Sequence, residues 1–336
     1  MADRRTPHGF NLLNAVVLIL ATVGSLLLCE VLVRWFVPVR NVGPTFSVYD
    51  ARYGKVLKES FSCMRITPEF TMRFTTNSLG FRGPEPEGFP FRPILFIGDS
   101  FTSGYGVNDG EEFPELVRRA LAKQYGEGAV PVVNAGSGNT GNGYWVKFLN
   151  LDARKLNPRL VVFQFCGNDF ADNVAEEFFT LSPDGSLIEH FLPEQETGLR
   201  AVQEFLEKIP GLSYSYLAAL GRQAFAREGY SPDSIAESPA NIELTERIID
   251  EALTICARAG WSAIGLSAAS EDAGLDSVAA VFQRHKVAFL RIPGPESRAD
   301  LYYRVDKHWN AAGHAYVAQQ LLDRFANDTF IQKVHL

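Results

Sequence analysis

The chain has 336 residues, of which 46% are hydrophobic and 21% are charged, and its formal net charge is -7. This length and apolar content allow one large folded domain with appendages, and they exclude a chain that is disordered throughout. The acidic balance argues against a nucleic-acid partner, because phosphate binding needs a concentrated basic face that no stretch provides. A neutral or modestly polar ligand fits better.

A polar tail of residues 1–11 precedes an apolar run at 12–37. As a helix, Leu12–Phe36 would span about 36 Å, enough for a hydrocarbon core of about 30 Å, so we predict a membrane anchor. A cleaved signal peptide is the alternative, but the run is long and no small-residue cleavage site follows it. A lipoprotein signal at Cys29 is disfavoured because Leu28, just before it, is not small.

The charges around this run give its orientation only weakly. More basic residues follow the run than precede it, which by charge counting favours a cytoplasmic domain, although long translocated domains override this bias. The basic residues before the run are Arg4 and Arg5. Those at its C-terminal end or after it are Arg34, Arg40, Arg52 and Lys55. Glu30 lies four residues before Arg34, so the two side chains can pair near the membrane interface.

Residues 38–92 are interpreted as an extended arm that packs on the following domain. They mix apolar residues with Pro, Gly and Arg, and they end in Asn77-Ser78-Leu79-Gly80-Phe81-Arg82-Gly83 and a proline-rich segment. Of the four cysteines, Cys63 and Cys256 are the candidates for a bridge. Their interpretation as small buried apolar residues is favoured.

From residue 93 the sequence alternates between short apolar runs and amphipathic segments. The predicted strands are 94–97, 130–134, 160–165, 262–266 and 287–292, and the predicted helices are 113–125, 144–156, 242–259, 275–285 and 311–325. This alternation predicts an α/β domain at 93–336 with a parallel sheet of about five strands. The pattern lapses at about 172–240, where helices are predicted at 199–208 and 216–227. We expect an insertion over the active edge there.

Four polar blocks occur in this domain. They are Ile97-Gly98-Asp99-Ser100, Asn134-Ala135-Gly136, Gly167-Asn168-Asp169 and Asp306-Lys307-His308-Trp309. Each of the first three follows a predicted strand, so they should meet at the carboxyl edge of the sheet, where open α/β folds bind ligands. A serine nucleophile needs a base within hydrogen-bond reach. We predict Ser100 as nucleophile, His308 as base and Asp306 as the carboxylate that orients it.

The order and residues of these blocks resemble the SGNH or GDSL-like hydrolase superfamily over roughly residues 93–330. Its members are serine esterases, deacetylases and acyltransferases, so the resemblance implies a flavodoxin-like three-layer sandwich and an acyl-enzyme at Ser100. It also implies that the oxyanion donors are the backbone N–H groups of Ser100 and Gly136 and the side-chain amide of Asn168. Gly138 is an alternative to Gly136. Asp99 is interpreted as a structural turn carboxylate.

The last block departs from the superfamily's commoner form, because one residue instead of two separates the acid from the histidine. Asp-x-His-Trp also resembles the pair in alginate-type periplasmic O-acetyltransferases, where it precedes the serine. The resemblance to anchored members implies a single-pass protein whose catalytic domain lies on the periplasmic side of the cytoplasmic membrane.

We expect the substrate to be an ester or an acetylated small molecule or glycan. No cofactor or metal is predicted, because a metal site of Asp306, His308 and His314 lacks a fourth ligand. One alternative is an O-acyltransferase that modifies a cell-envelope polysaccharide with the same triad. Another is a noncatalytic envelope-binding protein that keeps the fold.

Overall fold

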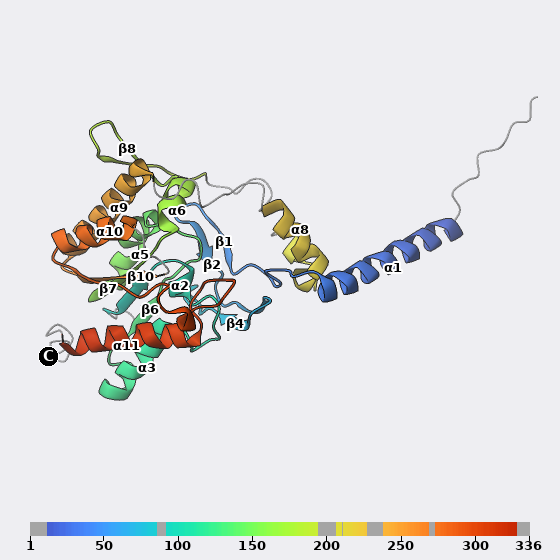
Figure 1. The fold of residues 1–336 in the computed structure, drawn as a ribbon, viewed down its shortest axis with the longest axis horizontal. Helices are drawn as coiled ribbons and strands as arrows, with labels where there is room; N and C mark the ends of the chain where they lie inside the picture. Colours follow the sequence, from blue (N-terminus) through green and yellow to red (C-terminus); the bar gives the residue numbers. More distant parts are fainter. Residues whose placement is uncertain are drawn as a thin grey trace, which may run out of the picture.

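The computed structural model describes residues 12–85, 92–193, 206–209, 211–226, 238–268 and 273–327. A parallel sheet lies at its centre (Figure 1), and its five strands have the order β11-β10-β7-β5-β6. The strands are β5 (Ile94–Ile97), β6 (Val132–Asn134), β7 (Leu160–Cys166), β10 (Ser262–Ala268) and β11 (Ala288–Leu290). In chain order this is the 2-1-3-4-5 arrangement of flavodoxin-like folds. The predicted fold class is confirmed.

Helices cover both faces of this sheet. Alternate side chains of β5 point to opposite faces, so Leu95 and Ile97 contact one apolar cluster and Ile94 and Phe96 contact the other. The first face carries α4 (Gly143–Asn150), α5 (Asp152–Leu156), α9 (Pro239–Ala259) and α10 (Ala273–Arg284), and the second carries α3 (Phe113–Tyr125) and α11 (Ala311–Asn327). Burial on both faces explains why β5 and β7 are apolar without alternation.

Two helices differ from the prediction by more than two residues. The helix predicted at 144–156 is interrupted at Leu151, whose backbone (φ -104°, ψ -78°) separates α4 from α5. Helix α9 begins at Pro239, three residues before the predicted start. The Ser238 side chain accepts a hydrogen bond from the N–H of Asn241, and proline suits the first helical position because it has no N–H to satisfy.

The arm contains two β-hairpins that the sequence did not predict. Strand β1 (Ser47–Asp50) pairs with β2 (Gly54–Leu57), and β3 (Ser62–Ile66) pairs with β4 (Thr71–Thr75), both antiparallel. A small apolar cluster joins the hairpins to the α/β domain. It contains Leu57, Cys63, Phe70, Met72 and Phe74 from the arm, with Tyr105 and Tyr303 from the domain packed against it. Cys63 and Cys256 are buried free thiols in different clusters.

Helix α1 (Leu12–Phe36) extends away from the rest of the molecule (Figure 1). Among the described residues it is the one helix long and apolar enough to cross a membrane, a property that membrane spans share with signal sequences. Its C-terminal end packs against α8 (Tyr216–Ala226). The Glu30 carboxylate accepts hydrogen bonds from the Ser215 hydroxyl (2.7 Å) and from the backbone N–H groups of Tyr216 (2.8 Å) and Leu217 (3.0 Å). Glu30 thus caps α8.

The region predicted as an insertion, at about 172–240, has two described parts that lie in different places. Its first part contains α6 (Asp169–Glu176) and a hairpin of β8 (Phe179–Leu181) and β9 (Leu187–Glu189), which follow directly on β7. Its second part, α8, lies beside helix α1 and agrees with the helix predicted at 216–227. Most of the helix predicted at 199–208 lies outside the described residues.

Candidate active site

Ser100 is the first residue of the short helix α2 (Ser100–Ser103), which follows β5 after a sharp turn. The Asp99 carboxylate caps this helix by accepting a hydrogen bond from the N–H of Phe101 at 2.9 Å. Burial raises the pKa of Asp99 to about 6. Position 98 must be glycine, because a Cβ there would lie 2.4 Å from the Thr102 hydroxyl oxygen. The turn presents Ser100 at the carboxyl edge of the sheet.

The side chains of Ser100, His308 and Asp306 form a continuous hydrogen-bonded chain. His308 Nε2 lies 2.7 Å from Ser100 Oγ, and His308 Nδ1 lies 2.5 Å from Asp306 Oδ1. The histidine and aspartate side chains are 22% and 24% exposed, so the chain is open to an incoming ligand. Lys307 has a left-handed backbone (φ +71°). This conformation turns the chain so that one intervening residue is enough for Asp306 to reach the imidazole.

Aromatic rings fix the imidazole and its loop. Phe101 stacks on His308 with a centroid distance of 4.7 Å, and the Tyr105 ring lies 4.9 Å away. Trp309 is fully buried and packs edge-on against Phe101. The loop closes through a hydrogen bond of 2.9 Å from the N–H of Tyr303 to the carbonyl of His308. The tryptophan of the last block therefore anchors the loop in the core.

Two of the predicted oxyanion donors, Asn168 and Gly136, already donate hydrogen bonds to other side chains. Asn168 Nδ2 donates to Asp172 Oδ2 at 2.6 Å, which leaves its second amide hydrogen for a ligand. The N–H of Gly136 instead donates to Asn134 Oδ1 at 3.0 Å. A Cβ at Gly138 would lie 3.5 Å from Cβ of Ser100, so Gly138 adjoins Ser100. This geometry favours the alternative, Gly138, over Gly136.

Glycine at position 136 has a different physical reason from the one expected. A Cβ at this position would lie 2.2 Å from the backbone nitrogen of Ser103, so the residue allows its strand end to pack closely on α2. The side chain of Asn134 has a role that the sequence did not predict. Its amide oxygen holds the turn that carries both glycines. An asparagine two residues before a glycine is typical of such side-chain-to-backbone turns.

The buried carboxylate of Asp169 joins the end of β7 to the residue that precedes α4. Asp169 is 1% exposed, and its Oδ2 accepts hydrogen bonds from Asn142 Nδ2 (2.7 Å) and from the N–H of Cys166 (3.1 Å). Burial raises the pKa of Asp169 well above its ordinary value. Asp169 therefore has a structural position behind the site.

The raised pKa of Glu176 predicts that the stability of the protein depends on pH. Its carboxylate accepts a hydrogen bond from the N–H of Gly141, and burial raises its pKa from 4.5 to about 8. Because the folded state binds this proton more tightly than the unfolded state, the contribution to stability is greatest below about pH 4.5 and is lost as the pH rises to about 8. We expect Tm to fall over this range and the fall to be smaller in Glu176→Gln.

Thermal melts of both proteins at pH 5 to 9 measure this effect, since each kcal/mol corresponds to about 2 to 4 °C in Tm for a domain of this size. Glu177→Gln, which changes the neighbouring exposed carboxylate, is the matched control and should melt like the wild type. Equal slopes for wild type and Glu176→Gln would contradict the assigned cause.

His314 lies in the core rather than beside Asp306. It is fully buried, and its Nδ1 accepts a hydrogen bond from the N–H of Phe113 at 3.2 Å. Burial lowers its pKa to about 3, so the ring stays neutral. Within the described ranges, no group of three His, Cys, Asp or Glu residues is arranged to hold a metal ion.

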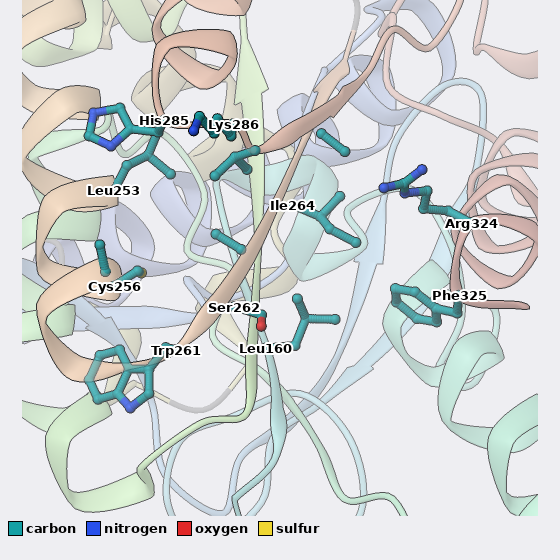
Figure 2. Close-up of a pocket in the computed structure, with 14 residues that line it drawn as sticks. Leu160, Leu253, Cys256, Trp261, Ser262, Ile264, His285, Lys286, Arg324 and Phe325 are labelled. Atoms are coloured by element: carbon teal, nitrogen blue, oxygen red, sulfur yellow. The ribbon is translucent and has the colours of Figure 1, made fainter. Parts of the chain in front are cut away.

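A cavity of about 320 Å³ lies at the opposite edge of the sheet from Ser100 (Figure 2). It is lined by Leu160 and Ser262, which begin β7 and β10, and by His285 and Phe325. Ligands of open α/β folds bind at the carboxyl ends of the strands. This cavity lies at the other ends of the strands, so its position is not that of a ligand site in such folds.

A family model described as the GDSL-like lipase/acylhydrolase family matches residues 96–316, which is more than half of the chain. The chain belongs to this family. The matched part of this GDSL-like protein runs from β5 to α11 and contains both Ser100 and His308. The resemblance to this superfamily is confirmed, and the chain is an ester-hydrolysing enzyme by membership.

Solved structures with a similar fold include an esterase, EstA, from Pseudoalteromonas sp. (10% identity, TM-score 0.42, covering 70% of this chain and 100% of that chain). TesA has 14% identity and a TM-score of 0.43, with 70% and 98% covered. The acetylxylan esterase Axe2 from Geobacillus stearothermophilus has 14% identity and a TM-score of 0.41, with 69% and 93% covered. At these identities the likenesses say nothing about the substrate of this GDSL-like protein. A search of curated protein sequences gave no significant match.

Proposed function

We propose that this protein is a serine esterase or deacetylase that acts on an ester or O-acetyl group through an acyl-enzyme at Ser100. The observation that carries the proposal is the chain of 2.7 Å and 2.5 Å contacts that joins Ser100 Oγ, His308 and Asp306. A hydroxyl is a poor nucleophile at neutral pH unless a positioned base takes its proton. Such a base is in contact here.

The reaction would follow from this geometry in two steps. As Ser100 Oγ attacks the carbonyl carbon, its proton passes to His308 Nε2, and Asp306 stabilises the imidazolium through Nδ1–H. The leaving alcohol takes the proton from Nε2, and the acyl group stays on Ser100. Water then attacks the acyl carbon and gives its proton to His308, after which the acid leaves and Ser100 regains its proton.

We propose the backbone N–H groups of Ser100 and Gly138 and the amide of Asn168 as the oxyanion donors. Each preplaced donor lowers the barrier by about 3 to 4 kcal/mol when charge develops on the carbonyl oxygen. Gly138 replaces Gly136 in this set because the N–H of Gly136 already donates to Asn134. The hydrogen bond to Asp172 fixes the direction of the Asn168 amide.

A fluorophosphonate probe tests the proposal directly. Because it reacts with activated serines, we expect it to label the wild type and to leave Ser100→Ala unlabelled. A folded wild type that remains unlabelled would support the noncatalytic binding alternative. Acyl transfer would use the same acyl-enzyme, so a comparison of acetate release with and without a glycan acceptor separates transfer from hydrolysis.

We also propose the arrangement relative to the membrane. Residues 12–37 would form a single-pass anchor after the tail 1–11, and the arm 38–92 and the catalytic domain 93–336 would lie on the periplasmic side. The apolar length of α1 supports the anchor. The labelling experiment extends to this point, because a membrane-impermeant fluorophosphonate should label Ser100 in intact spheroplasts. Labelling only after lysis would place the domain in the cytoplasm.

A further inference from the structure

The arm motif Asn-x-x-Gly-Phe-Arg contacts the turn that carries the nucleophile. Asn77 Oδ1 accepts hydrogen bonds from the N–H groups of Leu79 and Phe81, both at 3.0 Å, and Gly80 has φ +76°. This tight turn directs Arg82 into the catalytic domain, where its side chain is 1% exposed. A function for the motif should therefore be sought where the guanidinium ends.

The Arg82 guanidinium binds backbone carbonyls at the end of helix α2. Its Nη1 donates to the carbonyls of Ser103 (2.9 Å) and Gly104, and its Nη2 donates to the carbonyl of Val107 (2.7 Å). These carbonyls follow Ser100 by three to seven residues. A cation at a helix C-terminus satisfies carbonyls that have no partner within the helix. The arm thus holds the nucleophile turn from behind.

A second arm residue holds the loop that carries the acid and the base. The carboxylate of Glu69 accepts hydrogen bonds from the N–H of Val305 (2.9 Å) and from the N–H of Asp306 (2.7 Å). Glu69 lies in the turn between β3 and β4, which the Thr67 hydroxyl closes by accepting from the N–H groups of Glu69 and Phe70. Its position is therefore well defined.

The loop also has hydrogen bonds of its own, among them one of 3.2 Å from the N–H of Lys307 to the carbonyl of Tyr303, and Glu69 adds the bonds to Val305 and Asp306. The ends of the loop are joined by the bond from the N–H of Tyr303 to the carbonyl of His308 and by the bridge between Tyr302 and Trp309. Val305, at the middle, is 62% exposed. Beside the hairpin turn, Phe70 packs on the Tyr303 ring at 4.7 Å. The hydrogen bond from the backbone N–H of Asp306 to Glu69 thus links the arm directly to the residue that carries the carboxylate.

We propose that Glu69 is a positioning residue for the Ser100–His308–Asp306 chain, and that the arm aligns this chain by holding the acid–base loop through Glu69 and the nucleophile turn through Arg82. This inference rests on the proposed function. Asp306 must reach His308 across one intervening residue in a left-handed conformation. The carboxylate of Glu69 fixes the backbone on which that geometry depends.

The test compares Glu69→Ala and Glu69→Gln with wild type in the full-length protein. Because a misplacement of about 1 Å costs up to about 100-fold in rate, we expect kcat per fluorophosphonate-labelled serine to fall about 10- to 100-fold in Glu69→Ala, with KM within about twofold. Glu69→Gln keeps one acceptor oxygen, so its kcat per labelled serine should lie between the values of wild type and Glu69→Ala. The acid limb of the pH profile of kcat/KM should shift, since His308 loses its fixed partner.

Glu85→Ala is the matched control. Its carboxylate also accepts a backbone N–H in the arm, that of Ser78 at 2.9 Å, but this bond does not touch the acid–base loop. We expect Glu85→Ala to keep wild-type kcat. Counting labelled serines removes the effect of unfolded protein from kcat, and if Glu69→Ala does not fold, the nearly isosteric Glu69→Gln carries the test.

The inference is overturned if kcat per labelled serine in the folded Glu69 variants stays within about twofold of wild type, or if Glu85→Ala loses as much. These results differ from a failure of the proposed function. In that case the wild type itself would not label at Ser100, and the positioning role would fall with it.

Discussion

Replacing His308 with alanine is expected to abolish turnover of a small aryl acetate while leaving the fold intact. Removal of the base from a serine triad costs about 10⁴- to 10⁶-fold in kcat, because Ser100 then has no acceptor for its proton. The melting temperature should change little, since the His308 side chain is 22% exposed and the loop stays anchored by the buried Trp309. Steady-state kinetics and a thermal melt measure the two effects.

His285→Ala is a matched control for this experiment. Its ring is 21% exposed and contacts a carboxylate, with Nε2 lying 2.9 Å from Asp250 Oδ1, but it lines the cavity at the opposite edge of the sheet (Figure 2). We expect this variant to turn over the ester at the wild-type rate. If His308→Ala also kept its turnover, His308 could not be the base and the proposed mechanism would be wrong.

The sheet was predictable because strands buried on both faces need continuous apolar runs. Leu160–Cys166 shows this most clearly, since every one of its residues is buried. The arm hairpins were not predictable in the same way. Strand β2 has only four residues, three of them half-buried, so its pattern of apolar and polar residues differs little from that of a loop.

The polar blocks placed Ser100, Gly136 and Asn168 at one edge of the sheet, because these three blocks follow parallel strands. The fourth block, with Asp306 and His308, follows no such strand, and its place beside Ser100 was expected only from the order of the blocks in the superfamily that they resemble. The choice between Gly136 and Gly138 lay beyond the sequence. It depends on the Asn134 side chain, which takes the N–H of Gly136. Residue spacing does not reveal which backbone N–H groups are already used.

Contacts between segments that lie far apart in the chain were the least predictable from the sequence. Glu69 reaches the N–H of Asp306 across 237 positions, and Glu30 caps α8 across more than 180. A single carboxylate in a hairpin turn or in an apolar helix carries no pattern that names its partner. The spacing of Glu30 and Arg34 suggested a local pair, and it did not reveal that the Glu30 carboxylate also joins helix α1 to the start of α8.

Asp306→Asn is expected to lower kcat about 10²- to 10⁴-fold with little change in KM or Tm. An asparagine has nearly the same shape, so the backbone contact with Glu69 should persist. Its amide, however, can donate to His308 Nδ1, which favours the ring tautomer that carries hydrogen on Nε2 and cannot accept the proton of Ser100. The expected loss is thus specific to charge and tautomer.

Steady-state kinetics of Asp306→Asn beside Asp300→Asn make this test sharp. Asp300 pairs with Arg298 at 2.7 Å on the surface near the same loop, so its replacement should leave kcat unchanged. A value of kcat for Asp306→Asn within about threefold of wild type would show that His308 is oriented without this carboxylate. The 2.5 Å contact would then be structural, and the short spacing between acid and histidine would need another partner for the imidazole.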